Sequence, residues 1–161
     1  RSFNFVNSGF NLRPLDLTAA IGYSQFKRFN TMKKNRSINR SRIINSIKNS
    51  NLWKNQFSFL EPIKNLEPSW FGLPIILNGK YKNNKGLYLK KLNKNGVETR
   101  PIISGNFLNQ PSIKLYNLNQ NKKKFKNAQN VEEKGFFIGL DEEIISYQKI
   151  QYLTKTLLKF L

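Results

Sequence analysis

The stretch GFNLRPLDLTAAIGYSQF, residues 9–26, contains the clearest helix start in this chain. Pro14 suits the first turn of a helix, because its missing N–H would be unpaired there in any case. Asp16 follows, where the helix dipole favours an acidic side chain. An amide and a guanidinium, Asn11 and Arg13, stand directly before this start. Taken alone, this pair is compatible with turn and surface chemistry or with an anion site.

The helical pattern continues from Pro14 to about residue 49 and can break near Asn30. Its first half carries an apolar side made of Leu17, Ala20, Ile21, Phe26 and Phe29. Beyond Met32 the segment turns basic and polar. We therefore expect a long helix that begins buried and then leaves the body of the protein.

The second part of the chain alternates strand and helix patterns, after a loop at residues 50–68. Pro74 lies inside the first predicted strand and makes it an edge or bulged strand. Asp141 is expected to cap the last helix, with Glu142 and Glu143 in its first turn. Strands are predicted at residues 69–77, 97–103 and 136–140, and helices at 86–95, before Gly135, and after Asp141. This order predicts a small α/β or α+β domain with about three strands and helices on one face.

Composition limits the chemistry that this chain can perform. Its 161 residues, 39% of them hydrophobic, are enough for a domain with a core. The absence of Cys and His excludes disulfides, imidazole bases and the usual zinc ligand sets, so no metal site is expected. A lack of cysteine fits a cytoplasmic protein. No apolar run approaches the length of a membrane span, and no membrane partner is expected.

The formal net charge of +19 has two explanations. A basic surface is typical of proteins that bind nucleic acid. However, Asn is as plentiful as Lys, and Ile, Phe and Tyr are frequent, which also indicates a bias toward A/T-rich codons. We favour the second explanation, and a basic RNA-binding or ribosomal protein is kept as the competing hypothesis.

Three stretches together resemble one enzyme family. They are residues 9–26, GVETRPIISGNFLNQP at residues 96–111, and GFFIGLDEEIISYQKIQYLTKTLLKFL at residues 135–161. In this order they resemble segments of the DegT/DnrJ/StrS-type sugar aminotransferases, which are pyridoxal-phosphate (PLP) enzymes of aspartate aminotransferase fold type I. The resemblance implies that residues 1–49 are the end of a large cofactor domain with a long connecting helix. Residues 50–161 would form the C-terminal small domain.

The resemblance also implies which functional residues are present. No catalytic residue is expected in this chain, because the Schiff-base lysine of the family lies upstream of the first motif; the chain alone should be inactive. Asn11 matches the asparagine that reaches the cofactor phosphate of the partner subunit, so a homodimer is expected. Arg13 matches an arginine on the substrate side, where its planar fork could grip a phosphate.

Within the family, SGNFLNQP (residues 104–111) and PSWFG (residues 68–72) most resemble the sugar 3-dehydratases. That branch uses PLP or pyridoxamine phosphate on nucleotide-linked 4-keto-6-deoxysugars for surface polysaccharides, and a histidine often replaces the lysine. Arg100 and Asn106 would lie near the sugar nucleotide. The alternatives are a strand-end arginine in solvent and a turn asparagine after Gly105. A nucleotide-sugar aminotransferase is the alternative function, and the nucleotide, the sugar and the use of an iron–sulfur cluster stay open.

Overall fold

The computed structural model describes residues 4, 6, 7, 9, 15–118 and 121–161. At its centre is an antiparallel sheet of four strands in the order β1-β2-β4-β3. The strands are β1 (Phe57–Phe59), β2 (Gly72–Leu77), β3 (Thr99–Arg100) and β4 (Gly135–Gly139). The α-helices are α1 (Asp16–Phe26), α2 (Phe29–Lys48), α3 (Lys85–Lys94), α4 (Pro111–Leu115), α5 (Lys126–Lys134) and α6 (Tyr147–Lys159). Short 3-10 helices are η1 (Gly79–Asn84), η2 (Phe107–Asn109) and η3 (Lys122–Phe125).

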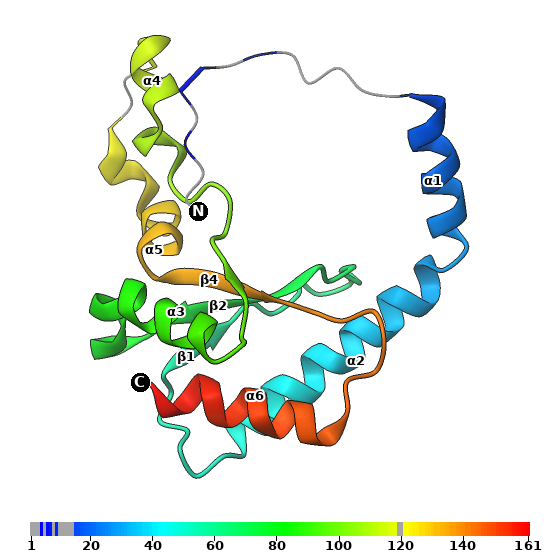
Figure 1. Cartoon of the computed structure of the whole chain (residues 1–161). Helices are drawn as coiled ribbons and strands as arrows, with labels where there is room; N and C mark the ends of the chain where they lie inside the picture. Colours follow the sequence, from blue (N-terminus) through cyan, green and yellow to red (C-terminus); the bar gives the residue numbers. More distant parts are fainter. Residues whose placement is uncertain (1–3, 5, 8, 10–14, 119–120) are drawn as a thin grey trace.

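Alternate residues of the strands build the core on one face of the sheet. Side chains two apart on a strand point to the same side, and Ile75 of β2 pairs directly with Phe136 of β4. These positions are buried together with apolar residues of α2, α3 and α6. Figure 1 shows α2 and α6 side by side below the sheet, with α4 and α5 above it. The expected mixed α/β domain is therefore confirmed, but helices cover both faces of the sheet rather than one.

Strand β1 was not expected, because three residues are too few to show a period-two pattern. It pairs with β2 over the register Phe57↔Leu77 to Phe59↔Ile75, so β2 lies inside the sheet and the edge-strand prediction is wrong. Pro74 lies one residue beyond the last β1 pair and has a paired neighbour only in β4. The proline is thus tolerated at a position that is locally an edge.

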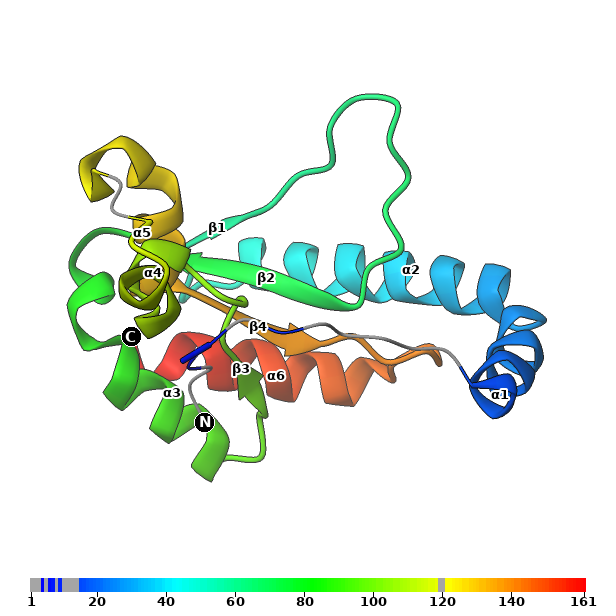
Figure 2. The same cartoon turned by 90° about the horizontal axis from the view of Figure 1, so that it is seen from above.

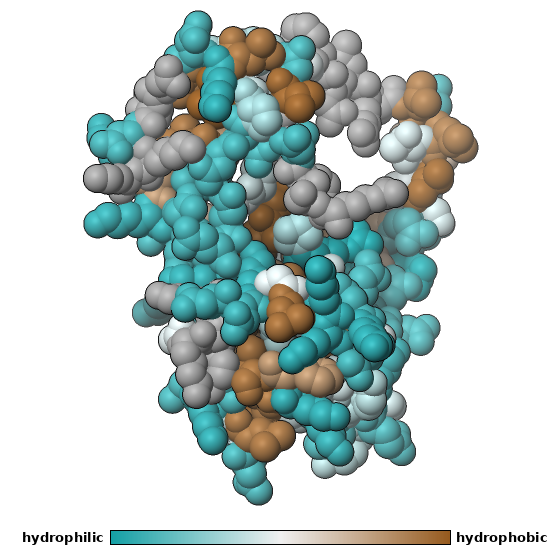
Figure 3. Space-filling view, turned by 60° about the vertical axis from the view of Figure 1, so that its left-hand side comes forward, coloured by the Kyte–Doolittle hydropathy of each residue, from teal (hydrophilic) through white to brown (hydrophobic). Residues whose placement is uncertain are grey.

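The long helix is buried at the opposite end from the one expected. It breaks between Phe26 and Phe29, close to the predicted position. Every residue of α1 is exposed, whereas Ile43, Ile44 and Ile47 near the end of α2 are buried. In Figure 1 α1 stands away from the sheet, and in Figure 3 apolar side chains gather at the upper right, over α1. The isoleucines face α6 and the sheet. Helix α1 meets the rest of the described chain at its end, where the Phe26 ring stacks on Phe29 of α2 at 6.0 Å.

The start of the last helix also differs from the expectation. Helix α6 begins at Tyr147, and its N-cap is Ser146, whose Oγ accepts a hydrogen bond from the Lys149 backbone N–H at 3.3 Å. Residues 141–145 instead cross α2, where buried Asn39 holds them. Its Nδ2 donates to the carbonyls of Asp141 (3.1 Å) and Glu143 (2.7 Å), and its Oδ1 accepts from the Ile145 N–H (3.0 Å). Two carbonyl acceptors and one N–H donor of the passing backbone are satisfied more fully by this amide than by a helix cap.

Other boundaries follow local chemistry. Helix α3 ends at Lys94, and Gly96 has a φ of +74°, the left-handed conformation expected of a helix-ending glycine. Helix α5 ends before Gly135, as predicted.

Tyr88 of α3 is buried in the core and donates its hydroxyl to the Leu157 carbonyl of α6 at 2.8 Å. None of the helices in the described ranges is long and apolar enough to cross a membrane.

Replacing Asn39 by leucine should destabilise the chain by about 3 kcal/mol, because the change leaves three backbone groups of residues 141–145 without their partner. Urea unfolding followed by far-UV circular dichroism measures this loss. Asn45→Leu, at an exposed position of the same helix, should change stability by less than about 0.5 kcal/mol. Equal effects of the two substitutions would contradict the role given to Asn39.

Stability should also fall at alkaline pH because of Tyr88. Burial raises the pKa of the Tyr88 phenol above its usual value. Above about pH 10 the unfolded chain releases this proton while the folded chain keeps it, so the stabilisation is complete below that pH and is lost as pH rises further. In Tyr88→Phe the decline should be shallower by up to about 1.4 kcal/mol per pH unit. Urea midpoints between pH 9 and 11 test this, and parallel curves for the two proteins would refute it.

Candidate functional site

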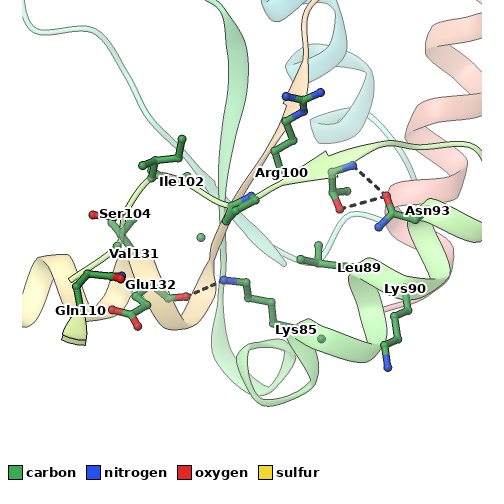
Figure 4. Close-up of a pocket in the computed structure, with 16 residues that line it drawn as sticks. Lys85, Leu89, Lys90, Asn93, Arg100, Ile102, Ser104, Gln110, Val131 and Glu132 are labelled. Carbon is green, nitrogen blue, oxygen red and sulfur yellow. Dashed lines mark hydrogen bonds between the residues drawn. The ribbon is translucent and has the colours of Figure 1, made fainter. Parts of the chain in front are cut away.

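The segment that follows β3 forms one wall of a pocket of about 390 Å³. The opposite wall comes from α3, and the floor from the end of α5. Figure 4 shows side chains from all three elements around this space. The lining includes Lys85 and Lys90 of α3, Arg100 of β3, Ser104 of the loop, and Glu132 of α5. The pocket is therefore bordered by apolar side chains such as Leu89 and Ile102 and by three cationic side chains against one carboxylate, and this excess of cationic groups suits an anionic ligand.

Lys85, at the start of α3, lines the pocket with its side chain directed toward Glu132 (Figure 4). Its Nζ donates to the Glu132 carbonyl at 2.7 Å, the bond drawn in Figure 4. Burial lowers the pKa of the Lys85 ammonium, and the nearby charge of Glu132 acts in the opposite direction. A lysine in these surroundings loses its proton more readily than an exposed one.

Arg100 lies at the rim of the same pocket. Its side chain is 61% exposed, and its Nε and Nη2 both donate to Glu98 Oε1 at 3.0 and 2.9 Å. An exposed ion pair of this kind contributes little to stability. The guanidinium is thus open to exchange Glu98 for a ligand phosphate.

A second hollow of about 720 Å³ also borders Arg100. The rings of Phe71 and Phe137, 5.9 Å apart, form part of its wall. Arg36 of α2 lines it as well, and its buried Nε has no hydrogen-bond partner among the described residues. Arg100 is therefore shared by two adjoining hollows.

Asn106 is placed differently from Arg100. It is only 2% exposed, and its Nδ2 donates to Gln129 Oε1 at 2.9 Å while its Oδ1 accepts from the Leu108 N–H at 3.1 Å. These contacts are those of the turn asparagine considered as the alternative. A direct contact between Asn106 and a substrate stays a prediction.

The other two expected site residues, Asn11 and Arg13, lie outside the described residues. The structure thus brings Arg100 and the loop at residues 101–110 to one pocket. It adds Lys85 and Glu132, which sequence analysis did not select. Nothing in the local sequence shows that the Glu132 carboxylate meets a loop 26 residues away.

The fold is that of sugar aminotransferases. The structure matches Helicobacter pylori PseC, an aminotransferase involved in the biosynthesis of pseudoaminic acid, with a TM-score of 0.74 at 20% identity, over 94% of this chain and 38% of that one. Residues 1–157 match the model of the DegT/DnrJ/EryC1/StrS aminotransferase family. The chain belongs to this family, which confirms the resemblance found in the three sequence motifs.

Relatives found by sequence carry the name of one particular enzyme of the family. The chain is 30% identical to the GDP-4-keto-6-deoxy-D-mannose 3-dehydratase of Escherichia coli O55:H7, over 97% of this chain and 38% of the relative. It is 32% identical to the enzyme of that name from Yersinia pseudotuberculosis, over 91% and 36%. A structure of the E. coli dehydratase with bound hydrated PLP matches with a TM-score of 0.75 at 28% identity, over 96% and 38%. The chain thus spans less than two-fifths of the length of these relatives.

Gly105 is required where the loop meets α5. Its φ is +66°, and a Cβ built on it would lie 2.6 Å from Glu132 Cβ. We expect Gly105→Ala to destabilise the chain by about 2 kcal/mol, from backbone strain and from this contact. Thermal unfolding measures the change.

Gly86→Ala is the matched control, since a Cβ there meets nothing within 4 Å and the residue lies in α3. It should be neutral or stabilising by up to about 1 kcal/mol. If both alanines behaved alike, the close contact between Gly105 and Glu132 would not matter for stability.

Proposed function

We propose that this chain is part of a PLP- or pyridoxamine-phosphate-dependent enzyme that removes the 3-hydroxyl of a nucleotide-linked 4-keto-6-deoxyhexose. The observation that carries the proposal is the match of 97% of the chain to a GDP-4-keto-6-deoxymannose 3-dehydratase at 30% identity. A Salmonella typhimurium relative, the lipopolysaccharide biosynthesis protein RfbH, is 28% identical over 68% of the chain. The product would accordingly serve surface polysaccharide synthesis.

In this proposal the chain supplies a small domain and part of a larger one. Residues 1–49 would be the end of the large domain with the connecting helix, and residues 50–161 the small domain. Helix α1 supports this division. Apolar side chains lie on several sides of it, as in a helix buried within a core, yet all of them are exposed here. A covering part of the enzyme would bury them, and this chain would be inactive without it.

The chain's own residues would bind and orient. Asn11 would donate its amide to the cofactor phosphate of the partner subunit, which makes the enzyme a homodimer; an amide donor fits a phosphate, which offers several acceptors. Arg13 and Arg100 would hold the diphosphate of the substrate. The cofactor, when bound, supplies the electron sink for the chemistry.

A nucleotide-sugar aminotransferase is the second candidate. The family description and the fold of PseC favour it. The two functions differ in product: a dehydratase yields a 3-deoxy sugar, whereas an aminotransferase leaves nitrogen on the sugar ring.

The whole protein, with any coding sequence upstream of Arg1, tests the proposal. We expect an absorbance band of bound PLP and conversion of GDP-4-keto-6-deoxymannose, with glutamate present, to a 3-deoxy product seen by mass spectrometry. Asn11→Ala should retain the cofactor about tenfold more weakly after dialysis, since one donor to a charged phosphate is lost. Asn4→Ala, in the same N-terminal stretch, should retain it normally.

Two results would count against the proposal. Unchanged cofactor retention in Asn11→Ala would contradict the role assigned to Asn11 and would leave the rest of the proposal standing. Absence of both the cofactor band and sugar conversion would overturn the enzymatic function. An aminated product would instead select the aminotransferase.

A further inference from the structure

We propose that Glu132 is a positioning residue that holds the loop at residues 104–110 in the conformation that shapes the substrate pocket. This inference rests on the proposed function, because Arg100, which lines the pocket, is assigned there to the substrate diphosphate. Glu132 would touch no substrate atom through its carboxylate. It would act through the loop that it binds.

The loop at residues 104–110 is hydrogen-bonded to one face of α5. The Asn106 backbone N–H donates to Glu132 Oε2 at 2.8 Å, and Asn109 Nδ2 donates to the same oxygen at 2.8 Å. Gln129, one helical turn earlier, accepts from Asn106 Nδ2 at 2.9 Å and from Asn109 Nδ2 at 3.0 Å. Four hydrogen bonds therefore run from the loop to two side chains of a single helix.

Glu132 contributes the stronger pair of these bonds. A carboxylate accepts hydrogen bonds about twice as strongly as a neutral group does. Asn106 is almost fully buried, so its N–H has little access to water if the carboxylate is removed. An unpaired buried N–H is costly, and the loop would move to relieve it.

Close packing and a further hydrogen bond also involve Glu132. Gly105 lies so close to Glu132 that a Cβ could not fit between them. The Glu132 carbonyl accepts from Lys85 Nζ at 2.7 Å, which ties α3 to the same point. Since Lys85, the loop and Glu132 all line the pocket, one residue of α5 fixes two of its walls.

The consequence concerns binding more than chemistry. A displaced loop would misplace the pocket wall and the adjoining Arg100, and so weaken binding equally in the substrate complex and in the transition state. Loss of such uniform binding raises KM and leaves kcat nearly unchanged. A purely structural role would have a different signature, namely a lower melting temperature and less active enzyme with a normal KM.

Kinetics of the whole enzyme with its nucleotide-linked 4-keto sugar test this. In Glu132→Ala, KM should rise about tenfold while kcat falls less than about threefold. Glu132→Gln keeps an acceptor oxygen and should restore KM to within about threefold of the original. Glu133→Ala removes a carboxylate from the same helix that accepts from Gln129 Nε2 at 2.8 Å and makes no bond to the loop within the described residues, so KM should stay unchanged.

Hydrogen exchange separates this inference from the proposed function. Amide exchange at residues 104–110 should accelerate about tenfold or more in Glu132→Ala, whether or not the protein turns over a sugar. Unchanged exchange, or an unchanged KM with accelerated exchange, would overturn the role of Glu132. If the enzyme converts no nucleotide sugar at all, the proposed function fails, and the exchange result then reports only how the loop is held.

Discussion

The packing of α2 and α6 against one face of the sheet is the constraint on which the rest of the structure depends. Ile43 and Ile47 of α2 and Leu157 of α6 are fully buried there, opposite the alternate positions of β2 and β4. Burial of such side chains is worth roughly 1.5–3 kcal/mol each. Because β4 leads into α6, the link between them must pass over α2, and Asn39 is placed to receive it. The path of residues 141–145 and the start of α6 follow from this contact.

Different kinds of interaction hold the elements on the core face of the sheet and those around the candidate site. The face covered by α2, α3 and α6 holds the continuous apolar core. The loop after β3 and α5 are joined largely by polar side chains, among them Glu132 and Gln129. Figure 2 shows α4 and α5 beside each other at the end of the sheet where β4 begins. Polar contacts fix direction and distance more sharply than apolar packing does. The candidate site thus lies where geometry is set by hydrogen bonds, on a support whose stability comes from elsewhere.

Local chemistry explains what could be predicted from the sequence. Gly96 ends a helix and the residues after Gly135 form a strand because each signal lies within a few neighbours. Contacts between distant segments explain the rest. Asp141 and Ser146 both resemble helix caps, and only the approach of Asn39 decides between them. An apolar pattern shows which side of a helix is buried but not which end finds a partner, so the direction of burial along α1 and α2 was reversed. A motif drew attention to Arg100, which the resemblance places near the sugar nucleotide and which lines a pocket in the structure, whereas Glu132 has no local signal.

Helix α1 has a consequence for how this chain behaves in concentrated solution. Leu17, Ile21 and Phe26 of α1 are between 57% and 74% exposed, and exposed apolar side chains gathered on one short helix attract other copies of the chain. The net charge of +19 opposes that attraction over a distance of about 10 Å at moderate ionic strength. Association between copies of the chain therefore depends on two opposing interactions, the attraction between the exposed apolar side chains of α1 and the repulsion between the positively charged surfaces. Added salt screens the repulsion and leaves the attraction in place, so the isolated chain is best dispersed when ionic strength is low.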